Sequence, residues 1–268
     1  MVTVRSCNSL RLRSQPDPFD FFHSIMSLSL FYQKPVIIDR VIHRQSRFKP
    51  QSGGFRFAAA TNSVPATSVE FALLCQDYPI VFTIDDQGSG VPLALTGLRN
   101  AENLFVNQDG KWDCRYVPAF VRQYPFISQL GTTPGEFSLM IDTEAPGFDA
   151  ADGEPLFNPD GSNSALLDNA VDMLNQYNSA ANLTLGFVAK LRELDLLVPR
   201  EIKLQTQMGN SVQMGGFFVV DEARLAALDD AGVLSLTRSG YLFGIYAHLI
   251  SLSNIQKLIT RLEQNGLA

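Results

Sequence analysis

Apolar residues recur every three or four positions between Leu167 and Leu194. The stripe consists of Leu167, Val171, Leu174, Tyr177, Ala181, Leu185, Val188, Leu191 and Leu194. This spacing matches the 3.6-residue period of an α-helix and predicts one long amphipathic helix, or two nearly collinear ones. A second stripe, from Tyr241 to Leu262, predicts a C-terminal helix with His248 on its apolar face.

Shorter apolar runs bounded by turn residues predict strands. The runs 79–85, 91–98 and 103–107, followed by an Asp-Gly turn, are typical of an antiparallel meander between residue 79 and about residue 112. Further strands are expected at 136–142, 198–207 and 211–221, the last two as a pair joined near 208–210. The blocks do not alternate regularly, which indicates an α+β fold: antiparallel sheet segments packed with a long central amphipathic helix and a C-terminal helix.

One local pattern occurs twice: a short helix, a Tyr-Pro pair and an apolar strand. It is found at 72–85 and again from Ala119 onward, where Pro118 and Pro125 confine the helix at both ends. Proline restricts the residue before it and ends the helix, while the tyrosine ring covers the corner and its hydroxyl finds a polar partner. This pattern favours a structural role for the aromatic cluster at 112–126.

The same cluster is also the best candidate for a binding site. Trp112, Arg115, Tyr116, Arg122 and Tyr124 bring rings and guanidinium groups together, and such groups bind anions and stack on flat ligands. We consider His248 as a residue at the edge of the same pocket, against the alternative of a hydrogen-bonded core histidine. For the two arginines the alternative is an internal ion pair with Glu102, Asp113 or another acid of the chain.

Motifs for catalysis or metal binding are not found. The three histidines and three cysteines have no zinc-ligand spacing, and no nucleophile elbow, dinucleotide fingerprint or phosphate loop occurs. The acidic segment 149–164 has oxygen ligands at short spacing, yet it lacks the calcium-loop register, so we interpret it as turns. Glu70, Asp221 and Glu222 are interpreted as helix-start residues. We predict no metal and no cofactor, assign no catalytic residue, and favour a protein that is not an enzyme.

Charge and composition limit the partners. The chain has 268 residues, 46% of them hydrophobic, and no apolar run approaches the ~20 residues that span a bilayer. Residues 1–57 hold nine Lys/Arg and three Asp/Glu, whereas 58–268 hold twelve and twenty-four. The acidic main part excludes nucleic acid as a general partner. The basic N-terminal part is expected to lie on this acidic part, the alternative being contact with an anionic partner.

The N-terminal sequence and the cysteines indicate the cellular compartment in which we expect the protein. Residues 1–25 lack the apolar core of a secretory signal, so we interpret them as a disordered extension upstream of a start at Met26, followed by a single domain at 26–268. Cys7, Cys75 and Cys114 form no C-x-x-C pair and are expected as reduced thiols, with a Cys75–Cys114 disulfide as the alternative. We therefore expect a cytoplasmic protein, with surface association only by a non-classical route.

Several blocks of the chain resemble the SapC family of bacterial proteins. They are FYQKPVIIDRVIHR, TNSVPATSVEFALLCQDYPIVF, GLRNAENLFVNQDGKWDCRYVPAFVRQYPF, GFFVVDEARLAAL and YAHLISLSNIQKLITRL, which span roughly residues 31–265 in order. The resemblance implies a role associated with the bacterial surface layer (S-layer), as an accessory or binding protein, and supplies no catalytic residues.

Two rival functions remain open. One is an enzyme or a binder of an anionic small molecule or peptide, with a pocket around Arg115, Arg122, Tyr124 and His248. The other is a structural partner in a larger bacterial assembly, and it implies a protein partner. A concave pocket with convergent polar groups would favour the first, and a large exposed apolar patch the second.

Overall fold

The computed structural model describes residues 30–50, 54–85, 88–130, 137–205 and 211–265. The predicted extension, 1–25, lies outside these ranges. The larger sheet has five strands in the order β3 (Ser63–Pro65), β5 (Gly90–Leu95), β4 (Ile80–Ile84), β10 (Ser211–Val220) and β9 (Leu197–Gln205). All neighbours in it are antiparallel, and β9 and β10 form the hairpin expected from the sequence.

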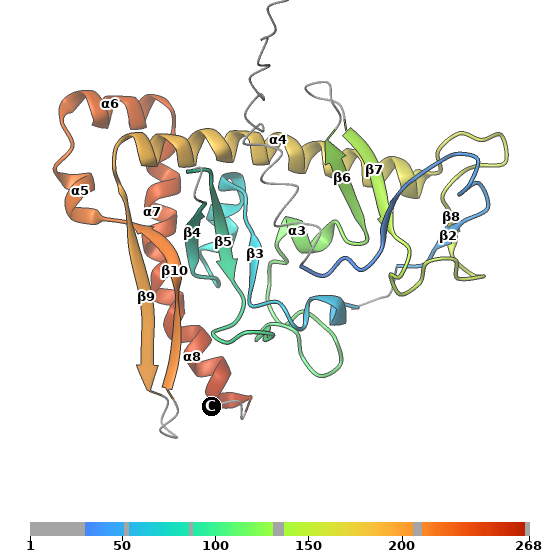
Figure 1. Ribbon diagram of the computed structural model, residues 1–268, viewed down its shortest axis with the longest axis horizontal. Helices are drawn as coiled ribbons and strands as arrows, with labels where there is room; N and C mark the ends of the chain where they lie inside the picture. Colours follow the sequence, from blue (N-terminus) through green and yellow to red (C-terminus); the bar gives the residue numbers. More distant parts are fainter. Residues whose placement is uncertain (1–29, 51–53, 86–87, 131–136, 206–210, 266–268) are drawn as a thin grey trace, which may run out of the picture.

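A smaller sheet lies beside the first. It consists of β1 (Pro35–Ile37), β7 (Phe137–Asp142) and β6 (Phe126–Leu130), again antiparallel. Beyond it, β2 (Arg47–Phe48) pairs with β8 (Glu154–Pro155) in a short ribbon. Figure 1 shows the two sheets side by side with the ribbon at one end of the molecule.

One continuous helix connects these parts. α4 (Ala165–Glu193) has 29 residues and begins at Ser164, whose side chain accepts a hydrogen bond from the amide of Leu167. In Figure 1 it runs along both sheets, from the β2–β8 ribbon to the β9–β10 hairpin. The periodic stripe therefore forms a single helix, and the α+β class with antiparallel sheets is confirmed.

The remaining helices are short. The 3-10 helices are η1 (Arg56–Ala58), η2 (Ser68–Glu70) and η3 (Leu252–Asn254). The α-helices are α2 (Phe71–Leu74), α3 (Ala119–Arg122), α5 (Glu222–Ala226), α6 (Asp230–Arg238), α7 (Tyr241–Ser251) and α8 (Ile255–Gln264). α7 packs on β4 and β10, so it covers one face of the larger sheet.

Two hydrophobic cores share α4. The smaller core, under the three-stranded sheet, takes Leu167, Ala170 and Leu174 from the first turns of the helix. The larger core lies under the five-stranded sheet and takes Tyr177, Ala181, Phe187, Val188 and Leu191 from its later turns. The buried stripe of one helix thus joins both cores.

Both Tyr-Pro corners have the expected arrangement. α2 is followed by Tyr78-Pro79 and β4, and α3 by Tyr124-Pro125 and β6, with the second Tyr-Pro bond in the cis form. Tyr78 donates its hydroxyl hydrogen to the carbonyl of Tyr116, which connects the first corner to the segment leading into the second.

Two expectations about the elements were wrong. Residues 103–107 are not a strand: Val106 and Trp112 form an isolated bridge, because the Asn103 side chain binds the amide of Phe105 and the carbonyl of Ala58. The C-terminal stripe is not one helix, since η3 separates α7 from α8. At that break Asn254 donates to the carbonyls of Cys75 and Tyr78.

Candidate functional site

The structure divides the six candidate residues into three groups. Tyr116 and Tyr124 are half-buried and Arg122 is exposed, and all three line pockets around α3. Trp112 and His248 belong to the interior. Arg115 is exposed and is not part of the lining of the pockets around α3 or of the pocket on the five-stranded sheet.

Trp112 has a structural role in the interior. Its indole Nε1 donates to the hydroxyl of Tyr78 at 2.8 Å, and its ring packs edge-on against Phe55 and nearly parallel to Phe105. These contacts bury the ring, and Trp112 is absent from the linings of the pockets described in this section, so its place in a binding site stays a prediction.

His248 is also a core residue: its side chain is fully buried, which agrees with the alternative of a hydrogen-bonded core histidine. Its Nε2 accepts the amide hydrogen of Val220 at 3.0 Å, so Nδ1 carries the ring hydrogen and donates it to the carbonyl of Ile80 at 2.8 Å. Burial lowers the pKa of His248 to about 4, against the opposing effect of the Ile80 hydrogen bond. The imidazole is neutral and inaccessible, which removes it as a catalytic base.

Glu70 positions the start of α3. Its carboxylate accepts hydrogen bonds from the amide and hydroxyl of Thr67, from the hydroxyl of Tyr116 and from the amide of Ala119, the first residue of α3. A buried carboxylate with four donors is fully satisfied. The expected helix-start role of Glu70 is thus observed at two helices, η2 and α3.

Arg122 is held in place by Tyr116 and Val117, which lie just before α3. Its Nε donates to the carbonyl of Val117 at 3.0 Å and its Nη2 to the hydroxyl of Tyr116 at 3.2 Å, and the guanidinium lies 5.5 Å from the centre of the Tyr116 ring. Burial, followed by the neighbouring Glu70, raises the pKa of Tyr116 to about 12. Tyr116 therefore stays protonated and connects the cation to the carboxylate of Glu70.

The internal ion pairs that were the alternative for Arg122 are not formed among the described residues. Asp113 is bound by Arg261 at 2.8 Å, and Glu102 accepts from the amides of Leu98 and Arg99. Arg122 uses only two of its five N–H groups in the contacts above, so the rest of its planar fork is free to bind a ligand.

A pocket of about 340 Å³ lies on one side of Arg122, and we call it the Arg56–Arg122 pocket. Besides the two arginines, its lining is Phe48, Pro50, Gly54, Phe55, Phe57, Asp109, Val121, Tyr124 and Pro146. The rings of Phe57 and Tyr124 stack with their centres 3.9 Å apart. Arg56 donates to the carbonyl of Gln108, which fixes the second cation at the pocket.

Sequence reasoning missed Arg56 and Phe57. They precede Arg122 by more than sixty residues, and nothing local relates the two segments. The available signal was the aromatic–Arg–aromatic run at 55–57, which repeats the composition of the predicted cluster in a turn-rich segment. Burial and the nearby Asp142 raise the pKa of Tyr124, so this wall of the pocket is an uncharged phenol.

A second pocket, of about 250 Å³, lies on the other side of Arg122. Glu70, Tyr116, Met173 and Tyr177 contribute to its lining. The Tyr177 hydroxyl is buried and has no hydrogen-bond partner within the described ranges. Since Glu70 supplies a negative charge here, this side suits an anion less well than the Arg56–Arg122 pocket.

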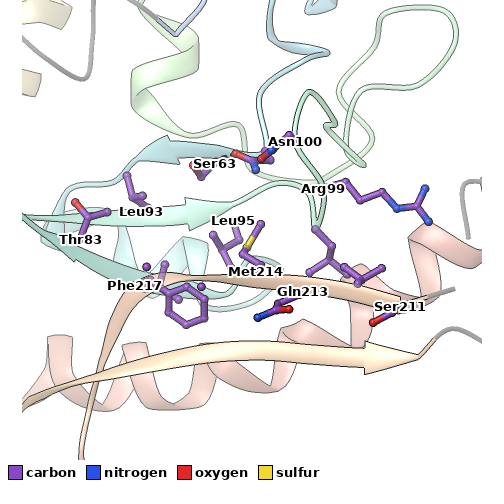
Figure 2. A pocket seen from close by; sticks show the side chains of 16 residues that line it. Ser63, Thr83, Leu93, Leu95, Arg99, Asn100, Ser211, Gln213, Met214 and Phe217 are labelled. Atoms are coloured by element: carbon purple, nitrogen blue, oxygen red, sulfur yellow. Dashed lines mark hydrogen bonds between the residues drawn. The ribbon is translucent and has the colours of Figure 1, made fainter.

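A third pocket, of about 530 Å³, lies on the face of the five-stranded sheet opposite α7 (Figure 2). Leu93, Leu95 and Phe217 are among its apolar groups, with Ser63, Thr83, Asn100 and Gln213 among the polar ones. Arg99 is the one charged residue of this lining, and Figure 2 shows its guanidinium extended away from the strands. This pocket therefore offers little to fix a charged ligand.

The acidic segment uses its side chains in turns. Asp160 accepts from the amide and hydroxyl of Ser162, and Asn163 donates to Asp168 at the start of α4. Within the described ranges, no group of three or more His, Cys, Asp or Glu residues could hold a metal ion. No helix of that same part is long and apolar enough to cross a bilayer.

Comparisons with known proteins give one result. A family model described as SapC matches residues 38–258, which is most of the chain. No curated protein and no solved structure gives a significant match.

Proposed function

This chain belongs to the SapC family, and we propose that it is a non-enzymatic binding protein that captures an anionic small molecule or a peptide carboxylate in the Arg56–Arg122 pocket. The observation that carries the proposal is the state of Arg122. Its guanidinium is positioned by two hydrogen bonds, is exposed, and forms no ion pair with a described carboxylate.

The pocket supplies two kinds of contact. The guanidinium groups match the planar geometry of a carboxylate, and the stacked rings of Phe57 and Tyr124 offer a flat apolar surface. Asp109 is the one acid in the lining, so the two cations leave the pocket with a net positive charge. These features together favour an anion that carries an aromatic or aliphatic group.

The finer role, association with a bacterial surface layer, rests on family membership alone. A protein partner that presents a carboxyl terminus would use the same pocket chemistry. We keep the cytoplasm as the proposed compartment, with surface association by a non-classical route, and the free thiols of Cys75 and Cys114 agree with a reducing location.

Binding can be tested with N-acetylphenylalanine, whose amide serves as a neutral control of the same shape. Trp112 is a built-in reporter, because it contacts Phe55, a residue of the pocket lining. We expect the acid to change Trp112 fluorescence and to show heat in calorimetric titration, with the amide weaker by about tenfold or more, as for loss of a charge-assisted contact.

Arg122→Ala separates binding from structure. The proposal predicts a melting temperature close to the wild-type value and loss of the acid-over-amide preference, with Arg99→Ala as a control at the other pocket. Equal binding of acid and amide by the wild type would contradict the proposal. A large loss of stability with unchanged binding would instead make Arg122 a purely structural residue.

A further inference from the structure

One face of the molecule exposes apolar side chains from four neighbouring helical segments, η2, α2, α4 and α7. Between 46% and 63% of the surface of each is exposed, and the residues are Val69, Leu73, Leu183, Phe243, Tyr246 and Ile250. We call this surface the α2–α4–α7 face. The lining of the Arg56–Arg122 pocket contains none of these residues, whereas Val69 and Leu73 reach the second pocket on the other side of Arg122.

Contacts between the helices make the face continuous. α2 packs on α7, and η2 packs on α4. Phe187 of α4 contacts Tyr241 and closely approaches Gly244 of α7, which brings the end of α4 next to the exposed residues of α7. Val69 and Leu183 line one shallow groove of about 420 Å³.

The packing of the core does not require this apolar surface. α7 directs Ile245 and His248 into the sheet, whereas Phe243, Tyr246 and Ile250 follow a three-and-four spacing on the opposite side. A surface helix normally carries polar residues there, and a helix that is apolar all round is normally buried. α7 therefore has a second apolar stripe without a partner among the described residues.

The α4 and α7 parts of the face also lack charge. Residues 173–189 of α4 and 239–256 around α7 contain no Asp, Glu, Lys or Arg, in a chain with 48 such residues and a net charge of −6. Glu70 is buried and bound by four donors, so it adds little charge at the surface. Depletion of charge with enrichment of aromatic residues is characteristic of the centre of a protein–protein interface.

We propose that the α2–α4–α7 face pairs with the same face of a second copy of this chain, giving a two-fold symmetric dimer. Two acidic chains repel each other over most of their surfaces, and this neutral face allows close approach without like-charge contacts. The six half-exposed apolar residues together offer roughly 600 Å², at the upper end of the ~300–600 Å² of the largest patch on a typical monomer and approaching the ~800 Å² per partner of a standard interface.

The test uses the full chain in sedimentation velocity over a hundredfold range of concentration. The wild type is expected to shift from monomer to dimer as its concentration rises. Ile250→Lys places two like charges in the interface and is expected to raise the dimer dissociation constant by at least about tenfold. Ile42→Lys is the matched control, because Ile42 is an isoleucine that is 79% exposed outside the face, and it should leave the constant unchanged.

A second measurement locates the contact even where a variant folds poorly. A photo-crosslinking phenylalanine at Tyr246 in otherwise unchanged protein should join two copies, and mass spectrometry should place the second end on α2, α4 or α7. A monomer at every concentration would overturn the proposal and leave the face to a different protein or a lipid surface. A dimer that Ile250→Lys does not weaken, or crosslinks outside the face, would overturn it as well.

Discussion

The imidazole of His248 occupies the position of a backbone pair between Ile80 and Val220. β4 and β10 are directly paired at Phe82 and Phe218, and the same antiparallel register would next oppose Ile80 to Val220. At that point the ring receives the amide hydrogen of Val220 and donates its own to the carbonyl of Ile80. A side chain from α7 therefore completes the sheet between its two halves.

This arrangement predicts a loss of stability in acid. The native state holds His248 neutral with a pKa of about 4, whereas the unfolded chain binds the proton near its ordinary 6.5. Because the unfolded state binds more protons between these values, the contribution is full above pH ~6.5 and is lost as pH falls toward ~4. It amounts to about 3 kcal/mol. Urea unfolding at a series of pH values measures it.

His248→Gln is the variant that isolates this effect. Glutamine carries a donor and an acceptor, but its amide directs them differently from the two ring nitrogens. We therefore expect at least one backbone group to lose its partner, at a cost of about 1–3 kcal/mol at pH 7. The decline between pH 6.5 and 4 should become shallower, since the titrating group is gone. An unchanged decline in the variant would assign the acid sensitivity to other groups.

Glu70→Gln tests the carboxylate that organises the start of α3. The amide nitrogen of glutamine cannot accept, so donors that now share two carboxylate oxygens would face an NH2 group. We expect a loss of about 2–3 kcal/mol in the free energy of unfolding, the range for a buried charged group whose partners are left unsatisfied. Glu222→Gln, at the exposed first turn of α5, should change it by less than about 0.5 kcal/mol. Equal effects would show that Glu70 has no special role.

Elements could be predicted from the sequence where the interactions that form them are between residues close in sequence. The stripe from Leu167 to Leu194 sets one face of one helix, and Pro79 and Pro125 act on the residue next to them, so α4 and both corners could be predicted. The strand predicted at 103–107 does not form, because the Asn103 side chain donates a hydrogen bond to the carbonyl of Ala58, which is distant in sequence.

The candidate site could be predicted only in part for the same reason. The composition of the sequence identified the cluster around Arg122. It could not show which aromatic residues lie at the surface and which lie in the core, and Trp112 and His248 proved to be buried. The second cation, Arg56, reaches the pocket only through tertiary packing. The position of β10 between β4 and β9, which brings Val220 to His248, likewise depends on pairing between distant segments.

The two described cysteines should behave as slow, unpaired thiols. Cys75 and Cys114 are free, so the disulfide alternative is not formed, and burial raises the pKa of both. In a Cys7→Ser background, iodoacetamide at pH 7.5 should label them more slowly than a free thiol, and the rate should still be rising above pH ~8.5. Rapid labelling at neutral pH, or a mass lower by two hydrogens without reductant, would contradict this.

Because α4 belongs to both cores, the proposed single domain at 26–268 can be tested by asking whether the two cores unfold together. Leu174 packs in the smaller core and Tyr177 in the larger, and the exposed Asn175 lies between them. If α4 couples the cores, the wild type should unfold in one cooperative transition, with equal calorimetric and van't Hoff enthalpies.

Asn175→Pro removes a helical hydrogen bond at this junction and clashes with the preceding turn, which costs about 3 kcal/mol or more. It should split the melt into two transitions. Asn175→Ala changes the same exposed position to the best helix former, so it should keep one transition at an equal or higher temperature. Two transitions in the wild type would mean that α4 spans the cores without coupling them, and the chain would then have two domains.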